Sequence, residues 1–458
     1  MNPSGANRGE FSAIDLALVV MDSPRRPLDF TLLFHFSEAP GIEALRAGAI
    51  SARNLYPTTG SHLEGKHWVR FPHPEAGVGT VSIASSREIT KVVNEFLERP
   101  IDLRTQMPVQ QLVLVNETNS QVTLVTRFHH AVADGMSAAM WLGHQLRVAH
   151  GKETPVTAAA PFQELALRSH PAPVRKSRFA YRGASDRLWT RNGESSGTRR
   201  WLTIKIPATA LRNACRGAGF TYNDLLATCA LEVFSRWNRQ HCGERKLKLG
   251  LWLPVNIRRQ STIGFGNGTG RIRLYHRAGE GASIADKCRG IRQQLSWTTQ
   301  HGEWAVPGQL PFKSLPFWLT GKLLRGYLNR PGVDMATGVF SHAERWMGED
   351  SELYKHLEKI ESIGQLDRRH CVAINGATHH GETWLTFTYD PTQLALADIQ
   401  SFVEMYQQQI GLAQQELAAD ERGLNADRSK IEKGSKQRPA KLPFPICANP
   451  RSSAAKFV

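Results

Sequence analysis

The residues best suited to chemistry stand together in one short stretch, HHAVADG at 129–135. Before it, residues 122–127 alternate between two faces, which is the pattern of a strand. After it, apolar residues recur at helical spacing within 136–146, and Asp134 stands where a helix N-cap is expected. The sequence therefore predicts two histidines at the end of a strand, directly before a helix that an acidic residue caps.

Two interpretations of this stretch compete. In the first, Asp134 only caps the helix and both histidines are ordinary loop residues. In the second, His130 is a general base, because an imidazole titrates near neutral pH and its neighbours can hold it in place. The complete pattern HHxxxDG is much more specific than a single histidine, and the strand and helix around it fit the second interpretation.

The motif resembles that of the CoA-dependent acyltransferase superfamily. This group includes chloramphenicol acetyltransferase, the condensation domains of peptide synthetases, plant-type acyltransferases and bacterial wax ester synthases. The order of two later stretches, TYNDLLATCALEVFSRW at 221–237 and LPVNIR at 253–258, also resembles landmarks of the second half of these proteins. The resemblance therefore extends over much of the chain.

The resemblance implies a role for each motif residue. His130 would be the general base, while His129 and Gly135 would shape the turn. Asp134 would be structural, and in relatives this aspartate is held by an arginine from the opposite lobe. Arg258 is the residue to which we transfer that partner, since an Asp–Arg pair would fix the turn and leave His130 available.

A glycine-rich stretch, GFGNGTG at 264–270, invites comparison with a phosphate-binding loop. It lacks the GK[ST] ending, and the alternating residues after it predict a strand where such a loop needs a helix. The resemblance implies instead a loop that lines the substrate channel. Gly266 and Asn267 match the Gly-Asn pair that is usual there.

The resemblance also implies the fold, which is α/β with mixed sheets: two chloramphenicol-acetyltransferase-like lobes around a central channel. The periodicity alone predicts only mixed α/β content. We place the boundaries of the segments by composition and motif. They are an N-terminal lobe at 1–155, a basic crossover linker at 156–200, a C-terminal lobe at 201–419 and a tail without fixed structure at 420–458. The crossover is interpreted as a solvated tether, and the alternative is a basic surface over a CoA or carrier-protein entrance.

Composition limits the partners. The formal charge of +16 suits a phosphate-bearing acyl-CoA or an acidic acyl carrier protein. The chain has no RNP-like sequence, zinc finger or basic helix with a dimerisation seam, so a nucleic-acid partner is not expected. The second histidine pair, at 379–380, has no third ligand at suitable spacing, so no metal site is expected either.

The cysteines and the apolar segments bear on location. Six cysteines are scattered without a CxxC pair, which is typical of reduced thiols. No apolar run is long enough to cross a bilayer and the N-terminus lacks a signal-peptide core, so we expect a cytoplasmic protein. The basic, apolar segment 309–330 is either a core helix or a helix that contacts a membrane surface or a lipid substrate.

The implied activity is acyl transfer from a thioester donor to a hydroxyl or amine acceptor. The donor, an acyl-CoA or the phosphopantetheine thioester of an acyl carrier protein, is a co-substrate, and no tightly bound cofactor is expected. The sequence lacks the DFGWG element of plant-type members and the Asn-x-Pro-Gly-Pro-like element of wax ester synthases. The nearest stretch by position is 336–341, so the acceptor stays open.

Three alternatives remain at this stage. One is a stand-alone condensation enzyme of the peptide-synthetase type that uses carrier-bound donors. Another is a hydrolase, because GMSAA at 135–139 resembles a nucleophile elbow without its final glycine. The third is a binding protein that kept the fold and lost turnover.

Overall fold

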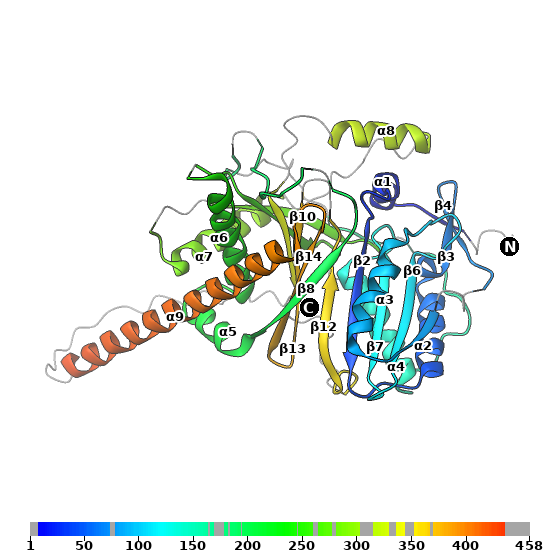
Figure 1. The fold of residues 1–458 in the computed structure, drawn as a ribbon, viewed down its shortest axis with the longest axis horizontal. Helices are drawn as coiled ribbons and strands as arrows, with labels where there is room; N and C mark the ends of the chain where they lie inside the picture. Colours follow the sequence, from blue (N-terminus) through cyan, green and yellow to red (C-terminus); the bar gives the residue numbers. More distant parts are fainter. Residues whose placement is uncertain are drawn as a thin grey trace, which may run out of the picture.

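The computed structural model describes most of the chain. The described residues are 8–73, 78–163, 165–168, 178–181, 184–193, 195–244, 246–259, 264–276, 281–302, 315–328, 336–343, 352–366 and 370–435, the last sixteen as backbone only. They form two lobes that lie side by side (Figure 1), each built on a mixed sheet.

The first lobe is built on a five-stranded sheet of order β12-β2-β7-β6-β5. Its strands are β2 (Asp29–Phe36), β5 (Val78–Ile83), β6 (Val109–Asn116), β7 (Val122–His129) and β12 (Leu357–Ile363), and its helices are α1 (Ala13–Met21), α2 (Ile42–Leu55), α3 (Ser86–Glu98) and α4 (Gly135–Ala149). A small sheet adds β1 (Arg8–Glu10), β3 (Ser61–Glu64) and β4 (His67–Arg70), with a short 3₁₀ turn at Pro57–Gly60. The apolar faces of α2 and α4 cover one side of the main sheet, and α3 covers part of the other.

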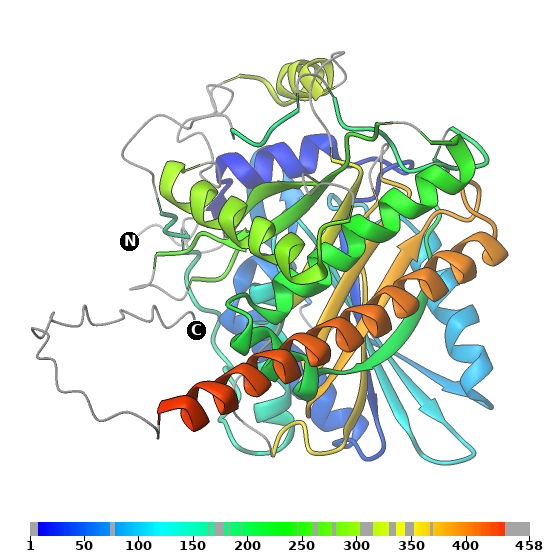
Figure 2. The same cartoon turned by 90° about the vertical axis from the view of Figure 1, so that its left-hand side faces the viewer.

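The second lobe is built on a six-stranded sheet of order β10-β9-β11-β13-β14-β8. Its strands are β8 (Arg200–Pro207), β9 (Gly250–Asn256), β10 (Thr269–Tyr275), β11 (Gly338–Ala343), β13 (Val372–His379) and β14 (Glu382–Tyr389). Its helices are α5 (Ala208–Gly217), α6 (Tyr222–Cys242), α7 (Ile284–His301) and α9 (Leu396–Ser435). Figure 2 shows that α6, α7 and α9 lie on one face of this sheet, and their apolar side chains form the larger core.

Strand β12 joins the two lobes. It lies within 201–419, the range that we predicted to form the C-terminal lobe. It nevertheless pairs antiparallel with β2 and so completes the sheet of the first lobe. Figure 1 shows it standing between β2 and the strands of the second lobe. The hydroxyls of Thr386 and Thr388 on β14 accept hydrogen bonds from the backbone N–H groups of Ser362 and Gly364, at 3.0 and 2.9 Å. The first sheet therefore contains a strand that comes from far along the chain.

Part of the crossover segment is packed, while other described residues of it, among them 157–159 and 191–193, are exposed. The side chains of Tyr181 and Leu188 are buried. The Arg199 guanidinium is also buried and lies 2.6 Å from an Asp29 carboxylate oxygen of the first lobe. This differs from a solvated tether, because several of its basic residues have partners in the folded lobes.

The end of the chain also differs from the prediction. Helix α9 continues to Ser435, so the prediction of no fixed structure is wrong for 420–435. This stretch contains no proline, and Glu, Arg and Lys, which favour a helix, make up six of its sixteen residues. Residues 436–458 lie outside the described residues.

The strand predicted at 122–127 and the helix predicted after it are confirmed as β7 and α4. Helix α6 begins with a capping box of Thr221 and Asp224, with both reciprocal hydrogen bonds present. Helix α8 (Phe317–Leu328) lies in the segment that we interpreted as a core or surface helix. It rests against α1 and leaves Trp318 68% exposed, and its contact with a membrane surface stays a prediction. No helix among the described residues is long and apolar enough to cross a bilayer.

Candidate active site

The motif lies at the end of β7, which runs between β2 and β6 in the middle of the first sheet. Every residue of β7 is buried. At the turn that follows, the N–H of His129 donates to the carbonyl of Pro108 and the N–H of His130 donates to that of Leu28, each at 2.8 Å. Both neighbouring strands therefore hold the backbone of the histidine pair.

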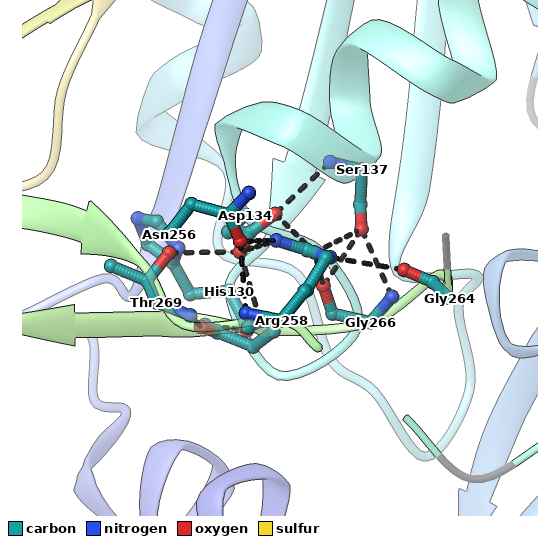
Figure 3. Close-up of polar contacts among 10 residues, drawn as sticks. His130, Asp134, Ser137, Asn256, Arg258, Gly264, Gly266 and Thr269 are labelled. Carbon is teal, nitrogen blue, oxygen red and sulfur yellow. Dashed lines mark hydrogen bonds and ion pairs between the residues drawn. The ribbon is translucent and has the colours of Figure 1, made fainter. Parts of the chain in front are cut away.

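Asp134 caps helix α4, as predicted, and accepts from the N–H of Ser137 at 3.0 Å. Its two carboxylate oxygens also accept from the Arg258 guanidinium, at 2.7 and 2.8 Å (Figure 3). The N–H of Gly268 and the hydroxyl of Thr269 donate to the same carboxylate at 2.9 and 2.8 Å. The motif aspartate is thus bound by the second lobe on several sides.

The charge of Asp134 is stable in this position. Burial alone raises the pKa of a carboxyl group, but the charge and hydrogen bonds of Arg258 outweigh burial and hold the pKa of Asp134 below its ordinary value. Both side chains of the pair are almost fully buried. A bidentate pair of this kind fixes geometry, so Asp134 acts on the turn and not on a substrate.

Arg258 and Ser137 complete a closed network. Arg258 also donates to the carbonyls of Gly264 and Gly266 and to the hydroxyl of Ser137, at 3.0, 2.6 and 2.8 Å. The Ser137 hydroxyl in turn donates to the carbonyl of Gly266 at 2.7 Å. This hydroxyl is buried and its proton is already donated, which argues against the nucleophile of the hydrolase alternative.

His130 has a different environment. Its ring packs against Phe30 in a tilted arrangement, with ring centroids 4.7 Å apart, and its backbone carbonyl accepts from the Asn267 side chain at 2.9 Å. Within the described part of the chain, no group forms a hydrogen bond with the ring itself. The imidazole is therefore positioned by this aromatic contact and by its backbone while its nitrogens remain available.

The pKa of His130 is lowered to about 4. Burial is the main cause, followed by the positive charge of Arg271 and a further electrostatic effect of His129, while the carboxylates of Asp134 and Asp29 act in the opposite direction. The ring is consequently neutral at physiological pH. A neutral imidazole can accept a proton, which is the state that a general base needs.

His129 supports the turn. Its Nδ1 accepts from the N–H of Ala131 at 3.1 Å, and its Nε2 lies 3.6 Å from an Asp22 carboxylate oxygen. The side chain is 1% exposed, so it does not reach a substrate. Gly135 is the first residue of α4, and Gly266 has φ of 139°, a backbone conformation that favours glycine.

A second ion cluster lies beside the motif and was not predicted. Asp29 pairs in register with His129, and its carboxylate lies 2.7 Å from Arg127 and 2.6 Å from Arg199. All three charged side chains are buried. Charged residues inside an apolar strand pattern, such as Asp29 in DFTLLFHF and Arg127 in VTLVTRFH, were the available signal.

The structure thus brings His129, His130, Asp134, Gly135, Arg258, Gly266 and Asn267 together at one junction of the lobes. Within the described ranges no cluster of His, Cys, Asp and Glu has the geometry of a metal site. The second histidine pair, at 379–380, lies elsewhere, at the turn between β13 and β14, where His380 is exposed with φ of 48°.

Comparison with known proteins gives results at the level of structure. No family model and no curated protein matches the sequence. A trichothecene 15-O-acetyltransferase from Fusarium sporotrichioides has a TM-score of 0.64 at 11% identity, over 90% of this chain and 97% of the other. The first condensation domain of the CDA synthetase also has 0.64, at 13% identity, over 90% and 98%. The X-domain from teicoplanin biosynthesis has 0.57 at 12% identity, over 91% and 96%.

These similarities define the fold of the chain. The chain has the two-lobed fold shared by CoA-dependent acyltransferases and condensation domains, and the similarity covers both lobes. The fold that the motif resemblance implied is therefore confirmed. At this level of identity the similarity establishes the fold alone, and the chemistry has to be argued from the site.

Proposed function

We propose that the protein is an acyltransferase that moves an acyl group from a thioester donor to a hydroxyl or amine acceptor, with His130 as general base. One observation carries the proposal. The HHxxxDG motif is intact, its aspartate is fixed by Arg258, and its second histidine is neutral with ring nitrogens that no described group uses. A fold that merely retained the motif as scaffold would not need an available imidazole there.

In the proposed mechanism, His130 Nε2 accepts the proton of the acceptor as its oxygen or nitrogen attacks the thioester carbonyl. The negative charge that develops on the carbonyl oxygen is stabilised by nearby donors. The tetrahedral intermediate then collapses, the carbon–sulfur bond breaks, and the proton held by His130 passes to the departing thiolate. No acyl-enzyme forms, and the thioester donor is a co-substrate of the reaction.

The donor is either an acyl-CoA or an acylated carrier protein. A net charge of +16 favours both, since CoA carries phosphates and carrier proteins are generally acidic. A stand-alone condensation enzyme with carrier-bound donors is the second candidate, and the similarity to the condensation domain of the CDA synthetase favours it. A binding protein of the same fold without turnover is the third.

The test measures thiol release from acyl-CoAs of several chain lengths with pooled alcohol and amine acceptors. We expect acceptor-dependent release that falls by about 10²–10⁴-fold in His130→Ala. A matched control is His380→Ala, which removes an exposed histidine far along the chain and leaves the rate unchanged. Release from acylated carrier protein alone would favour the condensation enzyme. No release from either donor would contradict the proposal and favour the binding protein.

A further inference from the structure

Two arginines and a tryptophan gather on the face of the second sheet that carries no helices. Arg271 and Arg273 lie on β10, and Trp252 pairs with Arg273 from β9. Leu251 and Leu274 point into the helix-side core, so by the alternation of a strand these three residues project from the opposite face. The guanidinium carbons of Arg271 and Arg273 lie 5.9 and 4.5 Å from the Trp252 ring centroid.

This cluster begins next to the motif. Thr269 starts the same strand face, and its hydroxyl donates to Asp134 at 2.8 Å. Arg271 follows two residues later, a step of about 7 Å along a strand. After burial, the charge of Arg271 is the strongest influence that lowers the pKa of His130, and the carboxylates of Asp134 and Asp29 oppose it. Arg271 is therefore close enough to act electrostatically on the proposed base.

The charge of Arg271 opposes the proposed chemistry. The imidazole of His130 must become an imidazolium during the reaction, and a neighbouring guanidinium makes that step less favourable. A negative charge on the bound substrate, held beside the guanidinium, would reduce the opposition. Arg271 is exposed, so a ligand can reach it.

The chemistry of the cluster indicates the class of ligand. A guanidinium presents a planar set of donors that matches a carboxylate or a phosphate, and stacking on an indole holds such a group in one orientation. We propose that Arg271, supported by Arg273 and Trp252, binds an anionic group, a carboxylate or phosphate, on a substrate of the proposed acyl transfer. This inference rests on the proposed function and specifies further that one of the two substrates carries a negatively charged group.

The anion can come from two sources. It can be a carboxylate on the acceptor or on the acyl chain, close to the reacting atoms, or a phosphate of CoA, which the pantetheine arm separates from the thioester. The experiment therefore varies each source alone. Acceptors are offered as hydroxy acids and as their methyl esters, for example 3-hydroxybutyrate and methyl 3-hydroxybutyrate. Donors are offered as acyl-CoA and as acyl-pantetheine, which lacks the nucleotide and the diphosphate.

The variant is Arg271→Gln, and the control is Arg216→Gln, which removes the same charge from an exposed position on α5. We expect kcat/KM to favour one anionic substrate over its neutral counterpart by about tenfold or more, and this preference to disappear in Arg271→Gln only. If Arg271→Gln loses the preference for the hydroxy acid over its ester, the anion is on the acceptor. If it loses the preference for acyl-CoA over acyl-pantetheine, the anion is on CoA. If Arg271→Gln keeps the same preference for anionic substrates as the wild type, the inference is overturned, while the proposed acyltransferase function still stands.

A second measurement does not depend on turnover. The His130 ring is titrated by NMR, with its signal assigned from its absence in His130→Gln. We expect the pKa of His130 to rise in Arg271→Gln, and to rise in the wild type when 3-hydroxybutyrate or CoA, but not the methyl ester, is added. If no donor supports transfer, the proposed function fails and this titration alone decides the inference. A pKa that is unchanged in Arg271→Gln and unaffected by both anions would overturn it.

Discussion

At the scale of single residues, the motif separates into one group that can react and several that position it. Asp134 and Arg258 use their charges on each other, and His129 is enclosed in the turn. His130 is the member whose ring packs against Phe30 and forms no hydrogen bond with a described residue. Fixing the base through its backbone and through this aromatic contact keeps both nitrogens available, as general-base catalysis requires.

The environment of His130 leads to a prediction about pH. Because burial and Arg271 lower its pKa to about 4, the free protein keeps this histidine deprotonated down to about pH 5. We expect kcat/KM for acyl transfer to be almost constant between about pH 5.5 and pH 7. An unperturbed histidine would titrate within this interval. The rate would then decrease toward pH 4. An acidic limb near pH 6.5 would contradict the environment described for this ring.

The sequence could predict the motif residues but not all of their partners. Asp134 and Arg258 were paired through a resemblance, since nothing in their spacing brings residues of two lobes together. Asp29, Arg127 and Arg199 were missed because charged residues usually face water. Here Asp29 is the shared partner of the two buried arginines, and this arrangement arises only after the chain has folded.

At the scale of elements, the alternating strand β7 was predictable from the sequence, whereas β12 was not. β12, LEKIESI, reads as a polar segment because Glu358, Lys359 and Glu361 interrupt its apolar residues. In the structure, Glu361 contacts His35 on β2 at 2.8 Å, and the hydrogen bond and charge of His35 outweigh burial and lower the pKa of Glu361 to about 2. A partner from the other end of the chain thus makes the segment compatible with a sheet.

The loop before β10 gives a prediction of its own. A Cβ atom at Gly268 would lie 2.7 Å from Cγ and 2.8 Å from Cζ of Arg258, whose guanidinium cannot move without leaving Asp134. We expect Gly268→Ala to lower the free energy of unfolding by about 3 kcal/mol, as when a buried ion pair is broken, and to reduce acyl transfer. Denaturant unfolding and the thiol-release assay measure the two effects.

The matched control for that change is Gly135→Ala, inside the motif itself. A Cβ at Gly135 would have no neighbour within 4 Å, and the residue begins a helix, where alanine is favourable. This variant should be as stable as the wild type or slightly more stable. Equal destabilisation by both substitutions would mean that the loop adapts and that the Asp134–Arg258 pair does not depend on close packing at Gly268.

At the scale of the whole molecule, the two lobes share secondary structure as well as an interface. β12 supplies the edge strand of the first sheet, and Arg199 supplies a buried cation beside β2. Division of the chain by composition near residue 200 therefore does not separate two independent folding units. The candidate active site, built from β7, α4 and the loop before β10, depends on the same union of the lobes.

This arrangement predicts how fragments behave. A fragment of residues 8–193 lacks both β12 and Arg199, so β2 becomes an open edge and Asp29 loses one of its two arginines. We expect it to unfold without cooperativity or to aggregate, because an exposed edge and a buried charge with too few partners are both unfavourable. A second fragment, 8–199 joined through a flexible linker to 352–366, restores both elements and should show a cooperative thermal transition. Folding of the two fragments with equal stability would show that the first lobe does not need the strand contributed by the second half of the chain.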